Sequence, residues 1–165
     1  MFTPHPLRFG MILLLFAMTA CNPFRSDSAV ELDPENTTLN TQWNATLASP
    51  EALAGITQMN GHASMAPSGD SASTIVTINL ANASPGGVHP WAARRGACGS
   101  SFSSPVLGST DAYESLVVDS NGRASARVSI PSRTPTSGQY FVVVHASRAN
   151  ASTVVACGNL AAPAR

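Results

Sequence analysis

The residues whose spacing most directly suggests chemistry are Met59, His62 and Met65, which follow one another at intervals of three. Thioether sulfur and imidazole nitrogen both suit copper, so this spacing could form a copper site. In a strand, however, successive side chains point to opposite faces, which separates His62 from the two methionines. A bulge at Gly61 could bring the three together, but core methionines beside a surface histidine are the favoured interpretation.

Cysteine is the second residue type that could do chemistry, and the chain holds three. Cys21 follows a short apolar run, Phe9–Met18, and two small residues; the run is far shorter than a membrane span. This pattern predicts a bacterial lipoprotein signal, cleaved before Cys21, which then carries lipid. The alternative is an ordinary secretory signal that leaves a free thiol. Cys98 and Cys157 remain as an even pair, which predicts a disulfide in an exported protein; two buried free thiols are the alternative.

Charge narrows the classes of partner. The chain has 9 basic and 9 acidic residues and a formal net charge of zero, so we predict no nucleic-acid partner. Membrane attachment would then come from the lipid anchor at Cys21 alone. Asn22 favours the outer membrane if the host is Gram-negative, which places the protein in the cell envelope. Arg94-Arg95 could contact an anion, although a solvated loop tip is the favoured interpretation.

The domain that must position these residues consists of short apolar runs separated by turn residues. We predict a signal peptide over 1–20, a flexible polar tether over 21–41 and one all-β domain over 42–162. Ser120-Asn121-Gly122 is a strong hairpin signal, because asparagine and glycine tolerate positive φ. About eight strands at even spacing indicate an antiparallel sandwich or closed barrel. The expected strands are Gln42–Ala48, Thr57–Met65, Ser73–Leu80, Val88–Ala93, Tyr113–Asp119, Arg123–Ile130, Tyr140–Val144 and Thr153–Ala156.

Three segments of this domain resemble, in order, motifs of the copper/zinc superoxide dismutases. Pro85–Trp91, followed by Gly96-Ala97-Cys98, is similar to the family's Pro-Gly-x-His-Gly-Phe-His-Val-His stretch and the cysteine after it. Val142–Ala146 resembles the family's later Val-Val-His strand, and Ala156–Leu160 resembles its closing Ala-Cys-Gly segment. The resemblance covers roughly residues 42–160. It implies an eight-stranded antiparallel Greek-key barrel with one disulfide.

The resemblance also implies where copper ligands should lie. The family holds copper with four imidazoles, which suit that metal. If Trp91 is aligned with the family's aromatic residue, Ala92 and Arg94 occupy two ligand positions. Alanine has no donor atom and the guanidinium has no lone pair, so neither can bind a metal. His89 then falls on a non-ligand histidine of the family, and only His145 falls on a ligand position.

A second alignment is open in the same segment. Shifting by a few residues makes His89 a ligand, but it leaves Gly87 at the paired position and breaks the Pro-Gly and aromatic matches. We prefer the first alignment. In both, the segment between Cys98 and Tyr113 lacks the expected histidines, and Val154 stands where the family's substrate-steering arginine would be.

These observations predict an exported, lipid-anchored dismutase-like domain with a degenerate metal site. We expect a non-enzymatic binding or structural module of the cell envelope, with no catalytic residues and no cofactor. Its partner would be an envelope protein or a second copy of the chain. The alternative is a weak copper-binding protein or a residual copper-dependent dismutase, which would bind copper through His145 and His89.

Overall fold

The computed structural model describes residues 41–53, 58–99 and 104–163, which form an all-β domain with one disulfide. The predicted signal peptide, the tether up to residue 40 and the predicted lipidation site Cys21 lie outside the described residues. Two short 3₁₀ turns, Glu51–Leu53 and Thr110–Ala112, accompany the strands. The strands are β1 Trp43–Ala48, β2 Asn60–Pro67, β3 Thr74–Ala81, β4 Val88–His89, β5 Trp91–Arg95, β6 Leu116–Val117, β7 Ala124–Ile130, β8 Tyr140–His145 and β9 Val154–Leu160.

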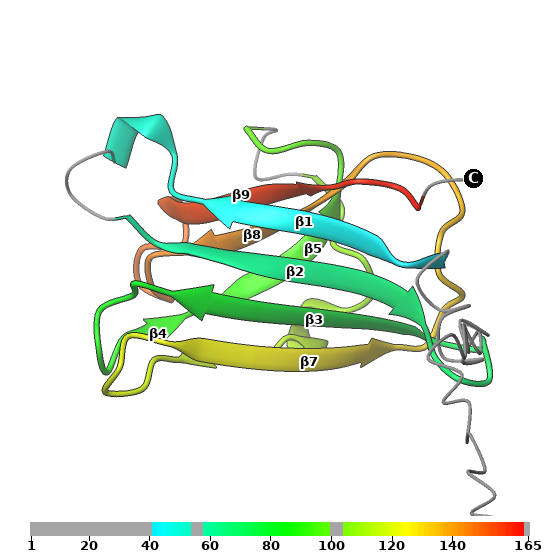
Figure 1. The fold of residues 1–165 in the computed structure, drawn as a ribbon, viewed down its shortest axis with the longest axis horizontal. Coiled ribbons are helices and arrows are strands. Elements are labelled where there is room, and N and C mark those ends of the chain that lie inside the picture. The colour runs from blue at the N-terminus through cyan, green and yellow to red at the C-terminus, as the bar shows by residue number, and fades with distance from the viewer. Residues whose placement is uncertain (1–40, 54–57, 100–103, 164–165) are drawn as a thin grey trace, which may run out of the picture. The chain divides into compact units, whose positions relative to one another are not determined.

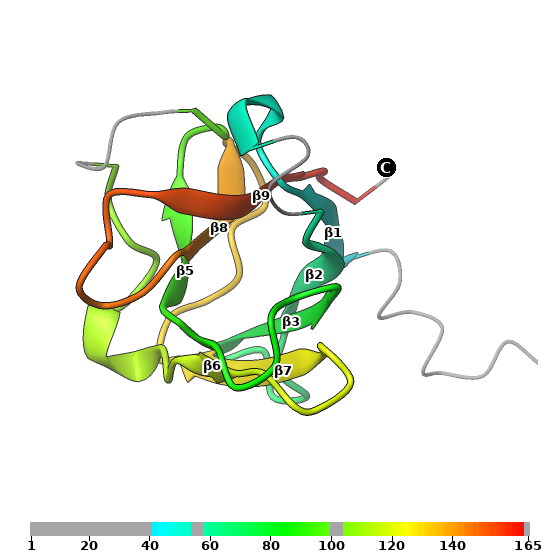
Figure 2. The same cartoon turned by 90° about the vertical axis from the view of Figure 1, so that its left-hand side faces the viewer.

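Seven of the strands form one antiparallel sheet in the order β5-β8-β9-β1-β2-β3-β7 (Figure 1). The short strands β4 and β6 pair separately. Figure 2 shows that the large sheet curls, so that β5, β8 and β9 face β3 and β7 across the interior. The prediction of an all-β antiparallel fold is confirmed, and each of the predicted apolar runs contains part of a strand.

The alternation of side chains along β1 and β2 explains how these strands build the core. Trp43, Ala45 and Leu47 are buried while the residues between them are exposed, as the period of two predicts. On β2, Met65 points into the core and His62 points outward. The ladder between β1 and β2 runs through Gly61 without a shift, so no bulge gathers Met59, His62 and Met65. The copper interpretation of this trio is therefore wrong.

The turn predicted at Ser120-Asn121-Gly122 is present, but the strands on its two sides, β6 and β7, do not pair with each other as in a hairpin. Gly122 has φ 72°, and Asp119 closes the turn because its Oδ1 accepts hydrogen bonds from the backbone N–H groups of Asn121 and Arg123. Strand β6 pairs with β4, whereas β7 pairs with β3. The turn therefore redirects the chain from the small sheet to the edge of the large one.

Candidate functional site

The candidate site is the outer face of strands β5, β8 and β9, which we call the β5–β8–β9 outer face. Alternate residues of β8 point to it, namely Phe141, Val143 and His145, while the residues between them join the core. All six residues of β8 are buried, so the outer face of this strand is covered by other residues, just as its inner face is covered by the core. The antiparallel register sets Ala92 opposite Val143 and Arg94 opposite Phe141, which brings both β5 residues to the same face.

A bulge in β9 completes this face. Val143 pairs with Cys157 and His145 pairs with Val154, and the register shifts by one residue between them. The shift lets Val155 and Ala156 both stay in the core while Val154 and Cys157 lie on the outer face. The Ser49 hydroxyl lies 2.9 Å from the Val155 carbonyl oxygen and so satisfies an acceptor at the bulge.

The predicted disulfide joins Cys98 to Cys157, with Cα atoms 5.9 Å apart. It ties the segment that follows β5 across the outer face to β9. The backbone N–H of Cys98 also donates to Asn159 Oδ1 at 2.7 Å, which holds the same segment against the strand. The cysteine pairing expected from the sequence is confirmed, and it supplies part of the cover over β8.

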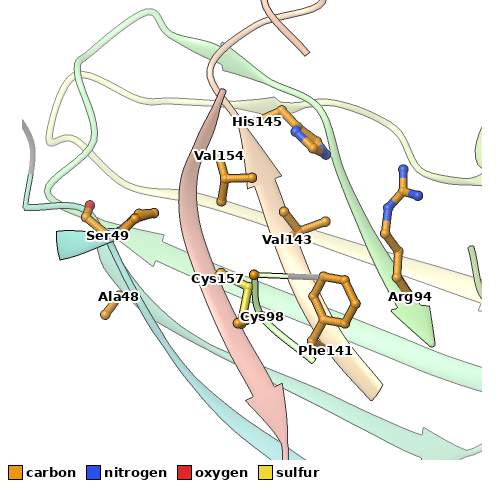
Figure 3. A pocket seen from close by; sticks show the side chains of 11 residues that line it. Ala48, Ser49, Arg94, Cys98, Phe141, Val143, His145, Val154 and Cys157 are labelled. Atoms are coloured by element: carbon orange, nitrogen blue, oxygen red, sulfur yellow. A yellow bond between two sulfur atoms is a disulfide. The ribbon is translucent and has the colours of Figure 1, made fainter. Parts of the chain in front are cut away.

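A hollow of about 550 Å³ lies on this face. Figure 3 shows the His145 imidazole and the Arg94 guanidinium at the same end of the hollow, with Val143 between them and the disulfide. The lining is mainly apolar, and none of its described residues is acidic. Its residues are Ala48, Ser49, Pro50, Arg94, Cys98, Gly99, Phe141, Val143, His145, Val154 and Cys157.

Arg94 is not the solvated loop tip that the sequence suggested. It lies within β5, it is half-buried, and its Nη1 donates to the Ser104 carbonyl oxygen at 2.7 Å. Strand β5 continues through Arg95 because its ladder with β8 runs as far as Tyr140. Of the two arginines, Arg95 is the exposed one, and Arg94 lines the hollow.

The two predicted copper ligands, His89 and His145, lie close together, but the contact is between one imidazole and the other residue's backbone. His89 Nδ1 lies 3.1 Å from the backbone carbonyl oxygen of His145. Both imidazoles are buried, with exposed fractions of 9% for His89 and 7% for His145, and His89 Nε2 has no hydrogen-bond partner among the residues that the structure describes. His145 lines the hollow, whereas His89 is not among its lining residues. Within the described ranges, no group of three His, Cys, Asp or Glu side chains could hold a metal ion.

The surroundings of His145 disfavour its charged form. Burial lowers the pKa of His145, and the positive charge of Arg94 lowers this pKa further. The imidazole is therefore neutral near pH 7, where it can donate one hydrogen bond and accept another. The same field that disfavours a proton on His145 also disfavours a metal cation there.

This lowered pKa predicts a pH dependence of stability. In the unfolded chain this histidine has a pKa of about 6.5, so it binds a proton more readily than in the folded protein. Above this pH the free energy of unfolding is therefore not reduced by protonation of His145. It should fall as the pH decreases from about 6.5 through the folded pKa of His145. We expect His145→Gln to flatten this decrease in urea unfolding measured between about pH 7 and 5. His62→Gln, at an exposed histidine, is the matched control; an equal flattening by this control would contradict the assignment.

No protein-family model matches the chain, and a search of curated proteins finds no match. Among the residues that the structure describes, no helix is long and apolar enough to cross a membrane.

Sequence reasoning missed most of this hollow. Phe141 and Val143 belong to a continuous apolar run that shows no alternation, so nothing in the run indicated which residues face outward. Ala48, Ser49 and Pro50 join the site only because β1 lies next to β9. Cys98 and Cys157 were the useful signals in the sequence. A disulfide between them requires that the two distant segments that carry them lie next to each other in the fold.

Proposed function

We propose that this chain is an exported, lipid-anchored binding module of the bacterial cell envelope. Its domain would be a superoxide dismutase-like Greek-key barrel that has lost the metal site. The lipid anchor at Cys21 rests on the sequence pattern before that residue. The binding role rests on the hollow of the β5–β8–β9 outer face.

The strand order supports the Greek-key assignment. β7 pairs with β3 and β5 pairs with β8, so the chain leaves one side of the sheet and returns to the other by long connections. A single residue, Pro90, separates β4 from β5. Proline interrupts the strand because it lacks the backbone N–H that a sheet ladder uses. Counting β4 and β5 as one strand gives the eight strands of the proposed barrel.

One observation carries the proposal that the metal site is degenerate. Ala92, Arg94 and His145 occupy one face, and the resemblance assigns all three to copper-ligand positions. Only His145 among them has a lone pair to offer. Arg94 adds a positive charge beside it, which opposes binding of a second cation.

Metal analysis tests this proposal. The experiment uses the full chain with Cys21→Ser, a change that removes the lipidated thiol and that we expect to release the protein from the membrane fraction. After equilibration with copper and zinc and thorough buffer exchange, we expect far less than one copper per chain. About one copper per chain, lost on His145→Ala but kept on His62→Ala, would overturn the proposal.

That contrary result would favour the second candidate function, a weak copper-binding protein. The observation in its favour is the buried His89, whose Nδ1 lies within hydrogen-bond distance of the backbone carbonyl oxygen of His145 and whose Nε2 has no partner in the described part of the chain. A dismutase assay would then follow on the copper-loaded chain.

A further inference from the structure

We propose that the hollow of the β5–β8–β9 outer face binds an amphiphile with an alkyl chain and a carboxylate head, such as a medium-chain fatty acid. This inference rests on the proposed binding function and names its ligand class. The carboxylate would lie against Arg94 and His145, and the alkyl chain would extend over Val143 toward the disulfide.

The size and lining of the hollow suit the alkyl chain. Its volume of about 550 Å³ lies within the range of roughly 300–1,000 Å³ that is typical of small-molecule pockets. Phe141, Val143 and Val154 contribute apolar surface from two neighbouring strands, and the disulfide adds sulfur atoms that are only weakly polar. An alkyl chain placed there would leave water for an apolar environment, which is favourable in proportion to the area buried.

Arg94 gives the hollow its preference for a carboxylate. The guanidinium is always protonated in proteins, so its positive charge is present whichever of its N–H groups are engaged. Its planar fork matches the two oxygens of a carboxylate. The hydrogen bond from Nη1 to the Ser104 carbonyl oxygen fixes the side chain at the end of the hollow. None of the described residues that line the hollow is acidic, so these residues add no negative charge that would repel a carboxylate.

His145 lies beside this charge and can add a neutral hydrogen bond. Figure 3 places its imidazole next to the Arg94 guanidinium, and burial together with Arg94 keeps it uncharged. Both residues also line a second hollow of about 500 Å³, which includes Trp91, Thr110 and Ser152. Arg94 and His145 therefore mark the junction of two hollows, and a head group at this junction would have space on the side away from the alkyl chain.

The test is a titration of the full chain carrying Cys21→Ser with decanoate below its micellar concentration, followed by calorimetry. Decanol, which lacks the charge, and decyltrimethylammonium, which reverses it, are titrated in parallel. We expect saturable one-site binding of decanoate and binding of the other two that is weaker on the order of ten- to a hundred-fold, the range for a hydrogen bond to a charged group. Equal binding of all three, or no saturable binding of decanoate, would overturn the proposal.

Two variants locate the site. Arg94→Gln should weaken decanoate binding on the order of ten- to a hundred-fold while changing decanol binding little. Arg95→Gln removes the same charge from the exposed neighbouring residue and is the matched control, which should bind decanoate like the parent. A similar loss in Arg95→Gln would contradict the site. If Arg94→Gln fails to fold, the comparison of the three ligands on the parent chain still decides the proposal.

These outcomes separate the two proposals. Stoichiometric copper uptake would overturn the non-metal function regardless of decanoate. An empty metal site with no selective decanoate binding would overturn only the ligand class inferred here.

Discussion

Replacing Cys98 and Cys157 together by serine should lower the free energy of unfolding by about 4 kcal/mol. The two cysteines are separated by 59 residues, and a cross-link over a loop of this length removes roughly that much conformational free energy from the unfolded chain. The folded sheet does not depend on the bond for its ladder, because every residue of β8 has a partner on β9 in spite of the bulge. The loss should therefore appear as a lower stability of the same fold.

Urea unfolding of the oxidised parent and of the double variant measures this difference. The parent treated with a reductant is the internal control, since it should unfold at the midpoint of the double variant. We also expect the double variant to loosen the segment after β5, because this segment would lose its covalent link to β9 and keep the hydrogen bond from the backbone N–H of residue 98 to Asn159 Oδ1. Identical midpoints for the oxidised and reduced parent would contradict the prediction.

Trp43→Ala should cost about 3–5 kcal/mol, the range for removing a large aromatic side chain from a core. Trp43 is 1% exposed and packs edge-to-face on Tyr140, with ring centroids 5.5 Å apart. Its Nε1 donates to the Pro135 carbonyl oxygen at 2.9 Å, so the side chain also fixes the loop that precedes β8. Truncation would leave a cavity and remove the partner of that carbonyl.

Trp43→Phe separates these two contributions. It keeps most of the apolar area and loses the hydrogen bond, so we expect a smaller cost of about 1–3 kcal/mol. Val117→Ala is the control, because Val117 is 67% exposed and its truncation should change stability by no more than about 0.5 kcal/mol. A cost of Trp43→Ala no larger than that of Val117→Ala would show that the core tolerates the cavity.

How much of this fold could be predicted depends on how local the determining interactions are. Strand β1 was predictable because its alternation is written in six consecutive residues, and the turn at Gly122 was predictable because it needs a positive φ. Strand β6 was predicted too long. It contains only Leu116 and Val117, because its partner β4 ends at His89, immediately before Pro90. The pairing of β4 with β6 joins segments far apart in the sequence, so no local pattern predicts where it ends.

The candidate site was less predictable than the fold, for the same reason. The sequence indicated His145 and the cysteine pair, but the ladder between β5 and β8 decides that Arg94 reaches the same face as His145. Strand β9 was expected to end at Ala156, yet it continues through Gly158 to Leu160. Glycine is required there, since a Cβ on Gly158 would lie 2.4 Å from the Thr46 carbonyl oxygen of β1. Such a close approach between the first and last strands leaves no local signal.

The contact between β1 and β9 also bears on when this domain can fold. The first strand, β1, lies next to the last strand, β9, in the sheet. Beyond the end of β9, the backbones of Asn44 and Ala161 exchange hydrogen bonds at 3.2 and 2.8 Å. A chain emerging from its N-terminus exposes the β1 edge until nearly every other residue has followed. Such high contact order slows folding and lengthens the time in which an unpaired edge can aggregate. A truncation before β9 would therefore expose the edges of β8 and β1, which β9 separates in the sheet, as two further sites for association.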